Sequence, residues 1–243
     1  MATISENIQQ LHGRIQRACQ QASRPVDSVT LLVVTKTFPA SDVREAFEAG
    51  ERRFGENYVQ EGVDKIDALA DLRGRVEWHL IGPLQSNKTR VVAERFDWVH
   101  SVNRLKIAQR LAEQRPPGLP PLNVCLQVNI SGEDSKSGLA PAEVAEVARA
   151  VAALPTLRLR GLMAIPEPAA TLEEQRRPHR ALAELSAALN RDFDLGLDTL
   201  SMGMSADMDA AILEGATMVR VGSAIFGARA RPEPPSAPSP PAA

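Results

Sequence analysis

Lys36 is the side chain of this sequence best suited to covalent chemistry, because it closes an apolar run that begins at Val29. Five of the eight residues before it are β-branched, which favours a strand. Both alternating faces of the run are apolar, so we expect a strand buried on both sides, as in a parallel sheet. An ammonium at the mouth of such a strand is costly to desolvate, which lowers its pKa and favours the neutral amine that carbonyl chemistry needs. The alternative is a lysine that extends its ammonium into water.

Two segments near the C-terminus carry serine and glycine where strands are expected to end. They are Ser201-Met202-Gly203-Met204-Ser205 and Arg220-Val221-Gly222-Ser223. Glycines let backbone amides approach an anion closely and serine hydroxyls add donors, so the two segments could together form a phosphate nest. Ser205 could also cap a helix through Glu214 whose N-terminus faces the same anion. Ordinary strand-to-helix turns are the alternative.

Arg220 lies in a strand that is otherwise uncharged, and a period of two places it on the same face as Gly222. A buried arginine needs a partner, which could be a ligand or, as the alternative, a structural carboxylate such as Glu56. The lysine, the nest and the arginine together suit pyridoxal 5′-phosphate. Its aldehyde would form a Schiff base with Lys36, its phosphate would lie in the nest, and a polar group would face its ring nitrogen.

A regular alternation of strands and helices must position these side chains. Eight strands are expected, at residues 29–36, 53–57, 76–82, 98–102, 124–130, 157–165, 199–202 and 218–226. Each but the last precedes a helix, the helix over 172–190 is expected to be interrupted near its start by Pro178, and an extra helix over 3–22 opens the chain. This pattern predicts an α/β fold, a single (β/α)8 TIM-type barrel with an extra N-terminal helix; an open doubly wound sheet is the alternative. In such barrels the loops after strands seven and eight often hold phosphate.

Composition excludes several classes of function. The chain has 243 residues and a net charge of −2, which gives no electrostatic footprint for nucleic acid. No segment approaches the ~18 apolar residues of a membrane span, and the N-terminus lacks a signal-peptide pattern. Cys19 and Cys125 are expected to be free thiols, and the four histidines form no metal-binding pattern. We therefore expect a cytoplasmic protein without a metal. Residues 1–229 are predicted to form the cofactor-binding barrel and residues 230–243 a disordered Pro/Ala-rich tail.

Several motifs resemble the YggS/PROSC family of pyridoxal phosphate homeostasis proteins. They are Leu31–Phe38, Phe54-Gly55-Glu56-Asn57, Trp78–Lys88, Asn129-Ile130-Ser131 with Ser135-Lys136-Ser137-Gly138, Gly161-Leu162-Met163, Leu200–Ser205 and Arg220–Gly227, and the resemblance covers residues ~5–229. It implies a barrel like the N-terminal domain of alanine racemase. It also implies that the cofactor is held by Lys36, Asn57, Ser201, Met202, Arg220, Gly222 and Ser223, with Arg220 facing the pyridine nitrogen. His79 is expected to support the barrel rather than touch the cofactor.

Two classes of function fit this resemblance. One is a monomeric protein without catalytic turnover that buffers pyridoxal phosphate and passes it to apo-enzymes; the other is a racemase or decarboxylase of the same barrel type. A racemase needs an acid/base group on each face of its substrate, and in the enzymes that this chain resembles one such group is a tyrosine from an added β-domain. Tyr58 is the single tyrosine here, and the residues after 229 are too few for such a domain. The sequence therefore favours the homeostasis protein.

Overall fold

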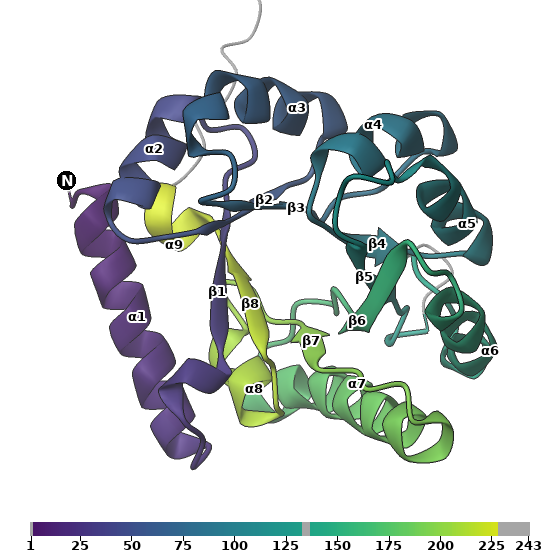
Figure 1. Cartoon of the computed structure of the whole chain (residues 1–243). Helices are drawn as coiled ribbons and strands as arrows, with labels where there is room; N and C mark the ends of the chain where they lie inside the picture. The colour runs from purple at the N-terminus through teal and green to yellow at the C-terminus, as the bar shows by residue number, and fades with distance from the viewer. Residues whose placement is uncertain (1, 133–136, 228–243) are drawn as a thin grey trace, which may run out of the picture.

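The strands of this chain pair in sequence order, and β1 closes the ring because it pairs in parallel with both β2 and β8 (Figure 1). The computed structural model describes residues 2–132 and 137–227. Its strands are β1 (Thr30–Val34), β2 (Arg53–Glu56), β3 (Glu77–Leu80), β4 (Trp98–Val102), β5 (Leu122–Gln127), β6 (Leu157–Met163), β7 (Thr199–Ser201) and β8 (Met218–Val221). The predicted barrel is confirmed, and the open sheet is wrong.

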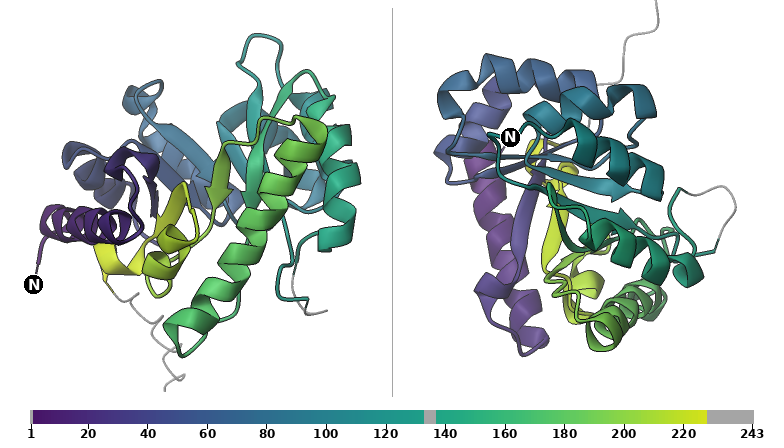
Figure 2. Two further views of the ribbon diagram at one scale, coloured as in Figure 1. Left: turned by 90° about the horizontal axis from the view of Figure 1, so that it is seen from below. Right: turned by 45° about the vertical axis from the view of Figure 1, so that its right-hand side comes forward.

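Helices surround this barrel on the outside. They are α1 (Ile4–Gln21), α2 (Ala40–Glu48), α3 (Val59–Ala68), α4 (Thr89–Arg95), α5 (Leu105–Gln114), α6 (Pro141–Ala152), α7 (Leu172–Phe193), α8 (Met208–Leu213) and α9 (Ser223–Phe226), with 3-10 turns at Val26–Ser28, Ala70–Leu72 and Ser86–Lys88. The predicted N-terminal helix is confirmed: α1 begins at a capping box of Thr3 and Glu6 and packs against α2, α8 and α9. The long α7 runs along the outside of the barrel between α6 and α8 (Figure 2).

Alternation along the strands separates two apolar regions. Leu32 and Val34 of β1 form a small buried cluster with Ile81 and Met218, inside the barrel. The residues between them, such as Val33, belong to the large core between the strands and the helices. A side chain two residues beyond Val34 or Met218 is therefore directed to the interior or its mouth.

Several predicted boundaries differ from the structure, and two of these differences bear on the site. β8 ends at Val221 instead of Phe226, because the Gly222 carbonyl accepts from the N–H groups of Ile225 and Phe226 and starts α9. α8 begins at Met208, and its N-cap residue is Asp207 rather than Ser205.

A further difference concerns Pro178, which was expected to interrupt a helix. α7 continues through it, held by a capping box at Thr171 and by the burial of Leu182 and Leu189. The missing proline N–H therefore costs less than this packing contributes.

Cys19 and Cys125 are buried free thiols, as predicted. None of the described helices is long and apolar enough to cross a membrane. The tail predicted for residues 230–243 lies outside the described residues.

Candidate functional site

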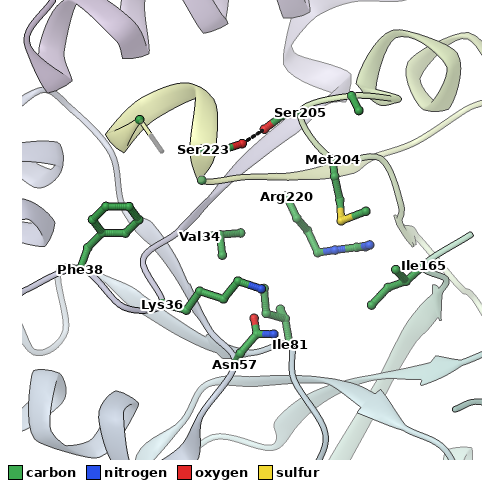
Figure 3. A pocket seen from close by; sticks show the side chains of 13 residues that line it. Val34, Lys36, Phe38, Asn57, Ile81, Ile165, Met204, Ser205, Arg220 and Ser223 are labelled. Carbon is green, nitrogen blue, oxygen red and sulfur yellow. Dashed lines mark hydrogen bonds between the residues drawn. The ribbon is translucent and has the colours of Figure 1, made fainter. Parts of the chain in front are cut away.

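Lys36 lines a cavity of about 510 Å³ at the carboxyl end of the barrel. Leu32 and Val34 face the barrel interior, and Lys36 continues this alternation just beyond the end of β1. Figure 3 shows its side chain extending toward the middle of the cavity, where the side chains of Asn57 and Arg220 also lie. The strand predicted from the sequence thus places a partly buried primary amine inside a preformed pocket.

Arg220 lies on the inward face of β8 and is 4% exposed. Its Nη1 donates to the Ser201 carbonyl at 2.5 Å and to the Ser201 hydroxyl at 2.9 Å, and its Nη2 donates to the Ala164 carbonyl at 2.9 Å. Burial lowers the pKa of Arg220 to about 10, so its guanidinium stays protonated at neutral pH. The ion pair with Glu56 considered from the sequence is wrong, because Glu56 accepts from Lys65 and Thr35. Arg220 is thus a cation held by neutral groups beside the amine of Lys36.

A chain of buried polar side chains continues from Ser201 into the barrel. His100 Nδ1 lies 2.8 Å from the Ser201 hydroxyl oxygen, and His100 Nε2 lies 2.9 Å from His79 Nδ1. Burial lowers the pKa of both histidines, that of His100 well below its ordinary value because His79 and Arg220 also oppose a charge there. Both rings are therefore neutral at neutral pH.

Because both rings are neutral, a donor and an acceptor can be assigned to each hydrogen bond between Ser201, His100 and His79. We assign the Ser201 hydroxyl as donor to His100, and His100 as donor to His79, which directs the remaining N–H of His79 toward the Glu77 carboxylate 3.6 Å away. The opposite direction would set a bare nitrogen lone pair against that carboxylate. His79 is fully buried and stacks on Trp98, so it supports the barrel and Arg220 rather than lining the cavity.

The loops after β7 and β8 meet at one side of the same cavity. There the Ser223 hydroxyl donates a 3.1 Å hydrogen bond to the Ser205 hydroxyl (Figure 3). A Cβ at Gly222 would lie 2.7 Å from the Val34 carbonyl oxygen, so a side chain there would disturb the join of β8 to β1. Arg14 of α1 fixes the Ser205 carbonyl from outside with a 2.8 Å hydrogen bond. The arrangement offers two hydroxyl donors and a close backbone approach, which suits an anionic group.

The sequence-predicted residues divide into two groups. Lys36, Asn57, Arg220, Gly222 and Ser223 line the cavity together. In this group Asn57 carries a buried Oδ1 without a hydrogen-bond partner in the structure, an acceptor that a ligand donor would satisfy.

Ser201 and Met202 lie outside the cavity lining. The Ser201 hydroxyl contacts Arg220 and His100, and Met202 is fully buried in the core under the helices. Adjacent residues of a strand face opposite sides, so these two side chains lie in different surroundings.

Sequence reasoning missed lining residues that follow the strand ends. Met204 lines the cavity from the loop after β7, Ile165 from beyond β6, and Phe38 from beyond Lys36. Ser205 was included in the predicted phosphate nest and also considered as a helix cap, but it was not among the residues named for the cofactor. Gly203 adopts a positive φ of 91°, and a glycine inside this segment was the sequence signal for a turn there.

Comparisons with known proteins agree with this geometry. Residues 7–230 match the model of the family described as alanine racemase, N-terminal domain. A Pseudomonas aeruginosa protein named pyridoxal phosphate homeostasis protein is 62% identical over 229 residues, which cover 94% of this chain and 97% of that protein. An Escherichia coli protein of the same name is 55% identical over 230 residues, covering 94% and 98%. The solved structure of PipY from Synechococcus elongatus with PLP bound has a TM-score of 0.77 at 37% identity, covering 88% of this chain and 99% of PipY.

Proposed function

This chain belongs to the alanine racemase N-terminal domain family, and we propose that, like its pyridoxal phosphate homeostasis relatives, it binds pyridoxal 5′-phosphate covalently through Lys36. We propose that it acts in the cytoplasm in vitamin B6 homeostasis, by buffering the cofactor or delivering it to apo-enzymes. The observation that carries this proposal is that the amine of Lys36, the cation of Arg220 and the anion-binding loops line one cavity.

The residues present fit this cofactor. Ser205 and Ser223 would hold its phosphate, Arg220 would face its ring nitrogen, and the side-chain carbonyl of Asn57 has an unused acceptor. When bound, pyridoxal phosphate supplies an aldehyde that condenses with a primary amine and releases water. Ile81 and Ile165 supply apolar parts of the cavity wall.

We propose that the bound cofactor has little turnover on amino acids. Among the described residues that line the cavity, the ionisable side chains are those of Lys36 and Arg220. An arginine that remains protonated is a poor base, so the second acid/base group that racemisation requires has no candidate in this described lining.

Exchange of the Cα proton tests this proposal. The loaded protein in deuterated water should exchange the Cα proton of alanine no faster than free pyridoxal phosphate does, followed by proton NMR. Saturable exchange that disappears in Lys36→Ala would instead assign the protein to the racemase class.

A further prediction concerns the binding of the phosphate group by Ser205 and Ser223. Replacing Ser205 and Ser223 together by alanine removes two hydroxyls that would donate to a phosphate. Each such charge-assisted hydrogen bond contributes about 1.5–3 kcal/mol, so the double variant should bind pyridoxal phosphate at least tenfold more weakly. Its affinity for pyridoxal, which lacks the phosphate, should stay unchanged in fluorescence titrations. An equal loss for both ligands would contradict the assignment of the loops.

We further propose that residues 1–229 form the binding domain and that the protein is monomeric. The amine, the guanidinium and the anion-binding loops come from β1, β8 and the loops after β7 and β8 of one barrel, which supports a site complete in a single chain. Sedimentation of the loaded protein as a single-chain species would test this state.

A further inference from the structure

Thr37, the residue after Lys36, has an unusual backbone conformation. Its φ is 68°, in the left-handed region, which β-branched residues rarely adopt because their side chains crowd the backbone. This turn directs the chain away from β1 at the residue where Lys36 enters the cavity. The surrounding structure must therefore hold Thr37 in place.

Three buried or partly buried charged residues supply that hold, and we name them the Lys65 cluster: Glu56, Glu61 and Lys65. Lys65 is 5% exposed on α3, and its Nζ lies 2.7 Å from a carboxylate oxygen of each acid. The Lys65 and Glu61 side chains lie one helical turn apart on α3, whereas Glu56 ends β2. Because each carboxylate has a buried partner, the three side chains are fixed relative to one another.

The Lys65 cluster binds the backbone on both sides of Lys36. Lys65 Nζ donates to the Thr35 carbonyl at 2.6 Å, and the Thr35 hydroxyl donates to Glu56 at 2.5 Å. The Thr37 N–H donates to Glu61 at 2.5 Å. The backbone before and after the lysine is thus anchored to a rigid group that lies outside the lining of the cavity.

We propose that the Lys65 cluster is the positioning device of Lys36: it holds Thr35 and the left-handed Thr37 so that the amine of Lys36 points at the aldehyde of a ligand whose phosphate lies beside Ser205 and Ser223. This inference rests on the proposed function. Fixing the amine at one distance from the phosphate site speeds bond formation, and small displacements slow it strongly. Glu61 acts through Thr37 and does not touch the ligand.

Glu61→Ala tests this role, because it removes the acceptor of the Thr37 N–H. The Glu61 side chain is 26% exposed, so the barrel should stay folded in this variant. In cofactor-free protein we would measure the rate at which pyridoxal phosphate becomes attached to Lys36 in a borohydride-fixable form. In parallel we would measure equilibrium binding of 4-deoxypyridoxine 5′-phosphate, which keeps the ring and phosphate but has no aldehyde. Attachment should slow about tenfold or more, with binding of the analogue unchanged.

Three further variants separate positioning from general damage. Glu61→Gln keeps an acceptor oxygen and should retain most of the wild-type rate. Asp64→Ala removes an exposed acid from the same helix and should leave the rate unchanged. Thr37→Gly in the Glu61→Ala background should recover part of the lost rate, because glycine adopts a positive φ without an anchor.

The outcomes distinguish this inference from the proposed function. Attachment to Lys36 at the wild-type rate in Glu61→Ala would overturn the inference, and so would an equal loss of rate and analogue binding. Failure of the wild-type protein to attach pyridoxal phosphate at Lys36 would overturn the proposed function itself.

Discussion

Lys36→Ala is expected to abolish the visible absorbance that bound pyridoxal phosphate gives the purified protein, while leaving the fold intact. Lys36 is the lysine that lines the described cavity, and the covalent link needs a primary amine there. Its side chain lies beyond the end of β1, so its loss removes no strand pairing. The spectrum before and after borohydride reduction measures this effect.

A matched control for this variant is Lys106→Ala. Lys106 is exposed on α5, on the outside of the barrel, and its variant should keep the full absorbance. The folded state of both proteins can be compared by thermal unfolding. A Lys36→Ala protein that retained a borohydride-fixable adduct at another residue would contradict the assignment.

The second large effect is expected for Arg220→Glu, which replaces a buried cation by a hydrogen-bond acceptor. Under the proposed binding mode, the protonated guanidinium of Arg220 would face the ring nitrogen and oppose its protonation. A carboxylate at this position would instead favour a proton on that nitrogen, so the absorption spectrum of the bound cofactor should shift.

Arg220→Glu also loses the hydrogen bonds to the carbonyls of Ser201 and Ala164. The variant should therefore unfold at a lower temperature, by the equivalent of about 3–5 kcal/mol. Arg220→Lys keeps a cation and is the matched control, with the wild-type spectrum expected. A wild-type spectrum in Arg220→Glu would show that the arginine does not face the ring.

Arg220 also affects the reactivity that we expect of a bound cofactor. A positive charge opposite the ring nitrogen, as the proposed binding mode has it, would reduce the ability of the ring to draw electrons from a bound amino acid. The guanidinium donates to the Ser201 hydroxyl, which is linked through His100 to His79. These three buried side chains are neutral and hold the charge of Arg220 in place. This expected weak electron withdrawal is consistent with the proposed homeostasis role, although arginine alone does not exclude racemisation.

Much of the fold could be predicted from the sequence because local patterns determine it. The β-branched run before Lys36 and the regular return of strand and helix patterns were sufficient to predict the barrel. The end of β8 was not predictable, because the run from Met218 to Phe226 is largely apolar apart from Arg220 and Ser223, and its pattern does not show that Gly222 turns the backbone. Whether an apolar segment continues as strand or helix depends on the hydrogen bonds that its glycine makes.

The candidate site was predictable where a strand end fixes it, as for Lys36, Asn57 and Gly222. It was less predictable where loops return to the cavity: Met204 and Ser205 lie in the predicted nest segment, but the sequence did not indicate which residues of that segment line the cavity. The Lys65 cluster was also beyond sequence reasoning, since its contacts depend on how α3 packs beside the turn after β1. Tertiary packing alone brings such residues together.

The most direct test of this account is to reduce the protein saturated with pyridoxal phosphate with borohydride and to identify the modified residue by peptide mass spectrometry. The sequence contains five lysines, so the experiment has clear alternatives. We predict one pyridoxyl group per chain, on Lys36. A label on another lysine, or no label at all, would contradict the account.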